Sequence, residues 1–110
     1  MTTETLSPIV ARYFTLSDGP DRAQVVDVFT DDATVLDDGH TYRGREAILA
    51  WLTGPASEFT TTSTRLSLEQ TDGVTVVVTL LEGNFPGGRV ELRYEFHETD
   101  GRIGSLSITA

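Results

Sequence analysis

The sequence predicts an α+β domain in which helices from the first half of the chain pack on one face of a mostly antiparallel sheet. Two observations indicate this. Apart from one short hairpin, apolar residues recur at helical spacing up to residue 54, and from residue 59 onward they alternate with polar residues as in strands. Helices gathered early and strands gathered late are typical of α+β domains. The chain has 110 residues, 38% apolar and 23% charged, so we expect a single domain over residues 1–110.

Three helices are expected in the first half. Ser7-Pro8 is a cap and first-turn pair that opens the first helix, and Tyr13 lies on the apolar stripe of that helix. The second helix places Val25, Val28 and Phe29 on one face. The three helices are expected after Ser7-Pro8, between Asp21 and Asp31-Asp32, and over Arg45–Leu52, where Gly54-Pro55 ends the third.

Six strands are expected around these helices. Asp38-Gly39 is a tight turn that joins the first two strands into a hairpin. The other four strands are separated by short segments rich in Gly, Asp and Asn, which predicts an antiparallel meander. The expected ranges are Ala33–Asp37, His40–Arg43, Phe59–Gln70, Val74–Glu82, Arg89–Glu98 and Arg102–Thr109.

Alternation assigns the two faces of the fifth strand. Val90, Leu92, Tyr94 and Phe96 share the face that we expect to meet the helices. Glu91, Arg93, Glu95 and His97 share the opposite face, which we expect to meet solvent or a partner subunit.

Charge and composition exclude several classes of function. The formal net charge is −9, from 17 acidic and 8 basic residues, and no Lys/Arg cluster exists to neutralise phosphates, so we expect no nucleic-acid or anionic membrane partner. The acidic balance favours a neutral ligand. The chain has no cysteine, no apolar run long enough to cross a bilayer and no secretory signal at its start, and we expect a cytoplasmic location. His40 and His97 show no metal-ligand spacing, and no cofactor motif is present, so we expect neither metal nor cofactor.

One segment resembles a known family. Phe29-Thr-Asp-Asp-Ala-Thr-Val-Leu-Asp37, followed by Gly39, Tyr42-Arg-Gly44 and Ala47-Ile48, is similar to a Phe-x-x-Asp-Ala-x-Val-x-Asp stretch of the NTF2-like superfamily, which includes SnoaL-like proteins and ketosteroid isomerases. Val10-Ala-Arg-Tyr13 resembles the first helix of bacterial ketosteroid isomerases. The resemblance implies a cone-shaped fold, with about three N-terminal helices on a strongly curved sheet that encloses an apolar pocket.

The resemblance to the isomerases also implies catalytic roles. Asp37 would be the general base and Tyr13 would donate a hydrogen bond to the enolate oxygen. The isomerases add a second, acidic donor on the third long strand, but Leu92 or Arg93 stands at that place here. An ordinary interpretation exists for each residue, since Asp37 could simply build the turn with Gly39 and Tyr13 could be a core residue.

The same resemblance also implies a kind of ligand, two alternative functions and a partner. We expect a small apolar ligand, and the candidate walls of its pocket are Val35, Trp51, Phe59, Leu92, Tyr94 and Phe96, which would otherwise fill an ordinary core. Besides an isomerase, two alternatives stay open: a non-catalytic binding or assembly module, and a SnoaL-type cyclase, lyase or hydrolase in which Asp37 activates a water or removes a proton in an aldol closure. Glu91 or Glu95 facing the pocket would favour the last of these. Family members commonly dimerise through their sheets, so we expect a homodimer.

Overall fold

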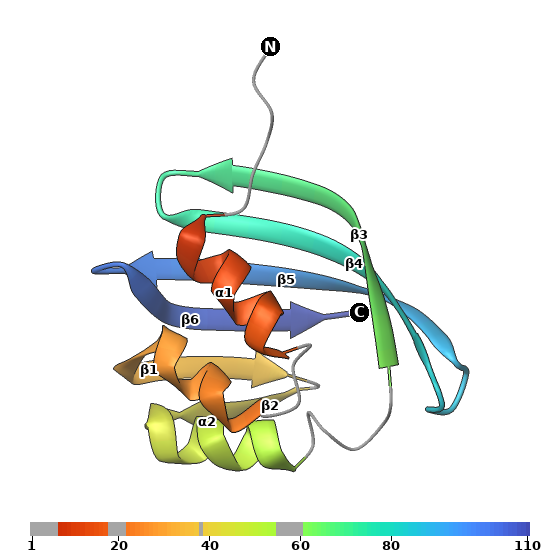
Figure 1. Cartoon of the computed structure of the whole chain (residues 1–110), viewed down its shortest axis with the longest axis horizontal. Coiled ribbons are helices and arrows are strands. Elements are labelled where there is room, and N and C mark those ends of the chain that lie inside the picture. The colour runs from red at the N-terminus through yellow and green to blue at the C-terminus, as the bar shows by residue number, and fades with distance from the viewer. Residues whose placement is uncertain (1–6, 18–21, 38, 55–60) are drawn as a thin grey trace.

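The computed structural model of the protein describes residues 7–17, 22–37, 39–54 and 61–110. Helices and strands follow one another as the sequence predicts, and the α+β class is confirmed (Figure 1). The elements are α1 (Pro8–Ser17), the 3₁₀ helix η1 (Arg22–Val28), β1 (Phe29–Asp37), β2 (His40–Arg43), α2 (Gly44–Thr53), β3 (Thr61–Thr71), β4 (Val74–Gly83), β5 (Arg89–Thr99) and β6 (Arg102–Thr109). Among the described residues no helix is both long and apolar enough to cross a membrane.

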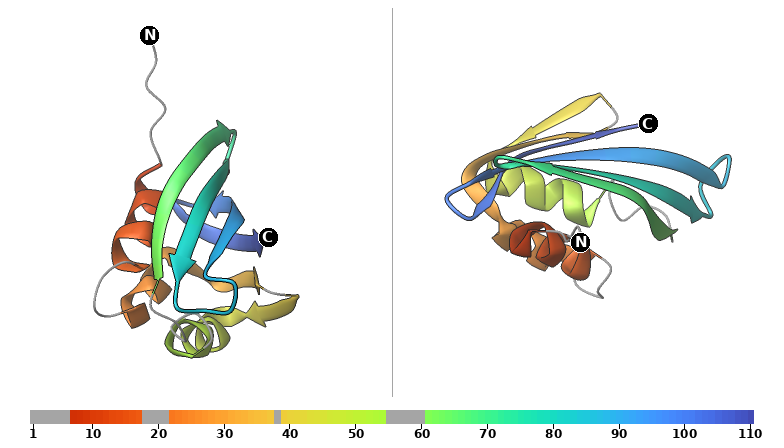
Figure 2. Two further views of the ribbon diagram at one scale, coloured as in Figure 1. Left: turned by 90° about the vertical axis from the view of Figure 1, so that its right-hand side faces the viewer. Right: turned by 90° about the horizontal axis from the view of Figure 1, so that it is seen from above.

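The six strands form one sheet in the order β2-β1-β6-β5-β4-β3. The predicted meander of β3 to β6 is confirmed, and β1 lies parallel to β6 at its edge. The turn Asp100-Gly101 has positive φ at both residues, 52° and 79°, which suits a tight hairpin between β5 and β6. Figure 2 shows that the sheet curves toward the side on which the helices lie. This side is called the inner face below, and the opposite side the outer face.

The second helix and the first strand differ from the prediction. We expected a helix that carries Phe29 and ends at Asp31-Asp32, but η1 ends at Val28 and β1 already begins at Phe29. The Arg45 guanidinium explains the extension: it donates two hydrogen bonds to the Phe29 carbonyl oxygen, at 2.8 and 3.2 Å, and pairs with Asp31 at 3.2 Å. The pairing of β1 with β6 is irregular between Phe29 and Thr34, where this anchored stretch lies. The predicted strand start at Phe59 lies outside the described residues.

The core fills the space between the helices and the inner face. Residues from the helices, the 3₁₀ helix and four strands meet there, each at most 7% exposed: Val10, Tyr13, Val25, Val28, Phe29, Ala33, Val35, Ile48, Trp51, Leu52, Val77, Phe96, Ile103, Leu106 and Ile108. Cross-strand register arranges the inner face in rows. One row joins Asp37, Ile108, Tyr94, Val77 and Leu68, and the next joins Val35, Leu106 and Phe96.

Strand β4 is apolar on the face that the core does not use. Its inner side chains are Thr75, Val77 and Thr79, which are at most 3% exposed. Its outer side chains are Val74, Val76, Val78 and Leu80, all half-buried. The register between β4 and β5 determines which side chains face inward. Val77 pairs with Tyr94, and the Tyr94 ring contacts Tyr13 of helix α1. The strand therefore places two hydroxyl groups inside and a stripe of branched aliphatic side chains outside.

Candidate functional site

Asp37 stands at the end of β1, beside α2. It pairs with His40 on β2 and with Ile108 on β6. Its side chain lies on the inner face with that of Val35, because strand side chains alternate. Oδ2 of Asp37 accepts a hydrogen bond from Nε1 of Trp51 at 3.0 Å. The carboxylate is thus held on the helix side of the sheet.

Trp51 fixes this carboxylate from a helix. Its side chain is 2% exposed, and a buried indole N–H needs an acceptor, which Asp37 supplies. The Tyr42 ring lies alongside, with a centroid separation of 6.0 Å and an interplanar angle of 34°. Helix α2 begins at Gly44, whose φ of +83° suits glycine, directly after the hairpin that carries Tyr42. Within the described residues, Trp51 makes the one side-chain hydrogen bond to Asp37, and Oδ1 is left for another partner.

Tyr13 is buried in a cluster of aromatic rings. It is 4% exposed, and its ring lies edge-on to Phe96 at 5.1 Å, to Phe29 at 6.2 Å and to Tyr94 at 6.4 Å. Phe14 completes the cluster at 5.2 Å from Tyr13. Helix α1 therefore places the Tyr13 ring against β5. Tyr94 of that strand lies in the same cross-strand row as Asp37.

The other predicted pocket residues divide by burial. Val35 and Phe96 are fully buried and belong to the core cluster. Leu92 and Tyr94 are half-buried and pack against that cluster on the inner face. Phe59 lies outside the described residues. Of the predicted wall residues on β5, Leu92 and Tyr94 are therefore the two that a ligand could touch.

The acids of β5 lie away from this wall. Leu92 occupies the inner position and Arg93 the outer one, so neither supplies the acid of the isomerases. Glu95 lies on the outer face, where its oxygens are 3.2 Å from Arg93 Nη1 and 2.9 Å from His97 Nε2. Glu91 is exposed on the same face. Neither Glu91 nor Glu95 is therefore placed for a role on the inner face.

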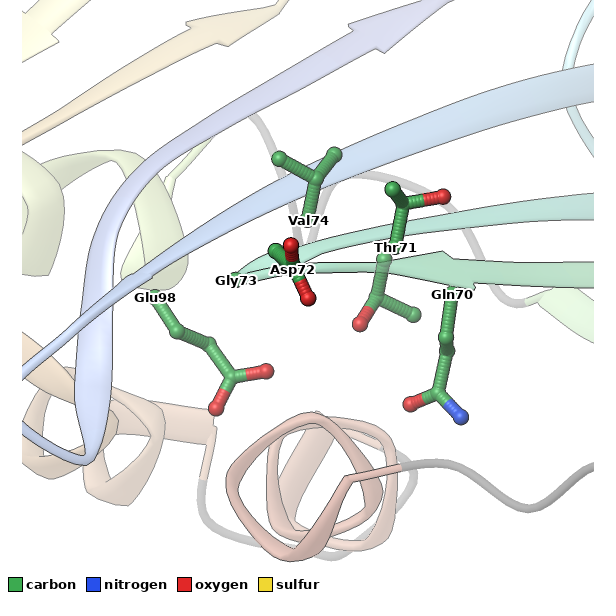
Figure 3. Close-up of a pocket in the computed structure, with 7 residues that line it drawn as sticks. Gln70, Thr71, Asp72, Gly73, Val74 and Glu98 are labelled. Carbon is green, nitrogen blue, oxygen red and sulfur yellow. The ribbon is translucent and has the colours of Figure 1, made fainter.

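A pocket of about 490 Å³ lies elsewhere, at the turn between β3 and β4 (Figure 3). Its lining is mostly polar: Gln70, Thr71, Asp72, Gly73, Val74, Thr75 and Glu98. Gln70 Oε1 also accepts a hydrogen bond from the Ser7 backbone N–H at 2.9 Å, which ties the start of α1 to this hairpin. The pocket contains neither Asp37 nor Tyr13, and its acidic, open lining does not suit an apolar neutral ligand. We therefore base the candidate site on the inner face.

Two features of the inner face were not predicted from the sequence. The bond between Trp51 and Asp37 depends on the rotation of α2 about its axis, although the sequence placed both residues on inward faces. The buried hydroxyl of Thr79 depends on the register of β4. Within the described residues, no group of three or more His, Cys, Asp and Glu side chains is arranged to hold a metal ion.

The sequence and the fold both have known relatives. The pattern of the SnoaL-like domain family matches residues 10–104. A protein of Sinorhizobium meliloti assigned as a polyketide cyclase is 32% identical and superposes with a TM-score of 0.88, covering 94% of this chain and 95% of the other. No curated protein matches the chain in sequence.

More distant structures share the fold alone. A protein of Catenulispora acidiphila with a ketosteroid isomerase-like fold, in complex with trimethylamine, is 18% identical with a TM-score of 0.84, over 96% of this chain and 87% of the other. A Mycobacterium tuberculosis protein in complex with estradiol-17β-hemisuccinate is 16% identical with a TM-score of 0.76, over 93% and 90%. Both ligands belong to those proteins.

Proposed function

The chain belongs to the SnoaL-like domain family of the NTF2-like superfamily, and we propose that it is an enzyme that removes a proton from a carbon next to a carbonyl group. The observation that carries this proposal is the hydrogen bond from Trp51 to Asp37. It holds one oxygen of a carboxylate on the apolar inner face and leaves the other to act as a general base. The substrate class we infer is small, largely apolar and neutral, because the inner face is apolar and the net charge is −9.

In this mechanism, Asp37 takes the proton and a phenol stabilises the enolate. Hydrogen-bond donors aimed at a developing oxyanion are a large source of catalysis. We assign Tyr13 as the donor, and Tyr94 takes the place of the missing acid because it shares the sheet row of Asp37 and lies 6.4 Å from the Tyr13 ring. Return of the proton to another carbon completes an allylic isomerisation.

A ring closure is the second candidate, favoured by the 32% identity to the assigned polyketide cyclase. The first step is the same, since an aldol closure also begins with removal of a proton next to a carbonyl. Asp37 would then hand the proton to the new alkoxide instead of to carbon. The two reactions differ in the fate of the enolate and share the base.

The experiment measures proton removal itself. An apolar cyclic enone is incubated with the protein in D₂O, and NMR follows deuterium incorporation next to its carbonyl. We expect Asp37→Asn to lower the exchange rate by about 10²–10⁴-fold, the usual contribution of a general base. The asparagine Oδ1 can still accept the Trp51 bond, so the fold is preserved. The variants Tyr13→Phe and Tyr94→Phe then measure how much each phenol contributes to the exchange rate.

Asp32→Asn is the matched control, because Asp32 lies on the same strand but is exposed. It should exchange the enone at the wild-type rate. Equal rates for wild type and Asp37→Asn would contradict the proposal. Quenching of Trp51 fluorescence by the enone without any exchange would instead indicate a binding module.

We further propose that two copies of the chain associate through the outer face. Val74, Val76, Val78 and Leu80 form an apolar stripe there, which we call the outer stripe. Arg93 and Glu95 lie beside it on β5, with opposite charges that a two-fold axis can match against each other. Association would bury the stripe, whereas the inner face carries the helices and the proposed site.

A further inference from the structure

We propose that the pocket at the turn between β3 and β4 is a second binding site, which takes a small organic cation with a primary ammonium group. The site uses neither Asp37 nor Tyr13, so the inference is independent of the proposed chemistry. Glu98 lies four residues beyond Tyr94 on β5, or about 13 Å along the strand, and Tyr94 is the residue in the row of Asp37. The pocket and the candidate catalytic site therefore lie at different places on the inner face.

The first supporting observation is the cavity itself. Its volume of about 490 Å³ lies in the range of small-molecule sites. Register brings its lining together on the inner face: Gln70 pairs with Thr75, and Thr75 pairs with Phe96, two residues before Glu98. The backbone N–H of Glu98 donates a hydrogen bond to the Gly73 carbonyl oxygen at 2.8 Å, which ties the end of β5 to the turn. In Figure 3, the side chains of Gln70 and Glu98 point to the same side, toward helix α1.

The charges of the lining determine the sign of the ligand. Asp72 and Glu98 are the ionisable residues among the seven that line the pocket, and both are acidic. Glu98 is half-buried, and within the described residues no Arg or His forms an ion pair with it. A carboxylate partly removed from water is stabilised by a cation that donates hydrogen bonds to it. The net charge of −9 also raises the concentration of cations around the chain.

A buried hydroxyl is the second, independent observation. Thr75 lines the pocket and is 2% exposed, and no hydrogen bond of its side chain is found in the described part of the chain. Buried hydroxyls normally have partners, so a ligand or a water in the pocket would supply the missing bond. Beside the pocket, Ser7 donates its backbone N–H to Gln70, and its own Oγ is buried without a partner among the same residues.

These features favour a primary ammonium over other cations. A metal ion needs several oxygen ligands at fixed distances, and the described residues contain no group of three or more acids, His or Cys arranged to hold one. A quaternary ammonium has no N–H and is recognised by aromatic rings, and no aromatic residue is among the seven that line the pocket. A primary ammonium has three N–H donors, which carboxylate and hydroxyl oxygens accept. The ligand class is therefore a small alkylamine such as a diamine.

The test compares two cations of equal charge: 1,4-diaminobutane and its hexamethylated analogue, which keeps both charges but has no N–H. Nitrogen-15-labelled protein is titrated with each at one fixed salt concentration, and NMR follows the backbone amide signals of Gly73 and Val74. We expect the diamine to shift these signals until they saturate. It should bind about ten-fold or more tightly than the analogue, as for hydrogen bonds to a charged group.

Three variants then measure the contribution of each group. Glu98→Gln removes the charge but keeps the size of the side chain and the backbone hydrogen bond to Gly73. It should weaken diamine binding by about ten-fold or more. Thr75→Val keeps the shape of the side chain without the hydroxyl and should weaken it about three- to ten-fold. Asp72→Asn should weaken it about two- to five-fold, because Asp72 is exposed.

Glu91→Gln is the matched control. Glu91 is on the same strand as Glu98 but is exposed on the outer face, and its substitution removes the same charge from the chain. It should bind the diamine as the wild type does. The comparison of the two cations on the wild-type protein does not depend on the folding of any variant.

Three results would overturn the inference: equal binding of the two cations, shifts of Gly73 and Val74 that do not saturate, or an equal loss of binding in Glu98→Gln and Glu91→Gln. Each would show that the net charge alone attracts the cations. The outcome is separable from that of the catalytic proposal. If Glu98→Gln loses the diamine while Asp37→Asn exchanges protons normally, the cation site stands and the base is wrong.

Discussion

The two faces of β4 reverse the usual pattern, in which the more apolar face of a strand packs against the core. The outer face has three valines and a leucine, and the inner face has Thr75, Val77 and Thr79. A strand judged by its own residues would turn the valines toward the core. The pairing of Val77 with Tyr94 turns them away from it. Among the described residues, the apolar stripe on the outer face is only half-buried, and the Thr79 hydroxyl on the inner face has no hydrogen-bond partner.

This comparison indicates what each face does. The part of the apolar stripe that stays in contact with water costs free energy, and its burial against a second copy recovers about 25 cal/mol per Å² of apolar area. A buried hydroxyl costs free energy until a ligand or water bonds it. The outer stripe therefore fits the proposed association of two copies, and the inner face keeps a hydroxyl that a water or a ligand can bond. Substitutions at neighbouring positions of β4 test this division.

The largest effect is expected on the inner face at Val77, which is fully buried. Val77→Asp places a carboxylate in the row of Tyr94, Ile108 and Leu68, none of which is a cation that could pair with it. We expect a loss of about 4 kcal/mol or more in the free energy of unfolding, enough to unfold much of a small domain. Urea denaturation followed by circular dichroism measures it. A variant as stable as the wild type would show that Val77 does not face the core.

A smaller and different effect is expected one residue further on. Val78 lies on the outer face opposite Arg93, which can pair with an introduced carboxylate. Val78→Asp should therefore keep the monomer folded, with circular dichroism like that of the wild type. In the proposed dimer it places two charges in the interface, and we expect dissociation to increase about 100-fold, or ~2.7 kcal/mol.

Sedimentation equilibrium over a range of concentrations measures this change. Val78→Thr is the matched control, because it keeps the shape of the side chain without a charge, and it should weaken association less. A wild-type protein that stays monomeric at every concentration would remove the outer stripe from consideration as an interface.

The success of sequence reasoning differed between β5 and β4. On β5, charged and apolar residues alternate, so the faces of Tyr94 and Glu95 follow from the sequence and the structure agrees. On β4, both faces hold branched aliphatic residues, so alternation carries no signal and only pairing with β5 decides. The extent of β1 was missed for a similar reason, since Arg45, sixteen residues away, holds Phe29 in the strand. Contacts between residues distant in sequence determined the faces of β4 and the start of β1, which local patterns could not predict.

The smallest effect concerns the outer face of β5. The hydrogen bond from His97, aided by the charges of His97 and Arg93, lowers the pKa of Glu95 from its ordinary value of 4.5. A carboxyl with a lowered folded-state pKa adds stability above its unfolded pKa, and this is lost as the pH falls through the folded value. Glu95→Gln should therefore reduce stability at pH 6 by at most about 1 kcal/mol, as for an exposed ion pair, and the difference should shrink toward pH 3. Thermal melts of both proteins at these two pH values measure it. If Val78→Asp also reduces the loss of stability that Glu95→Gln causes at pH 6, then Arg93 is shared between the two carboxylates. In that case the charged residues of β5 and the outer stripe form one surface.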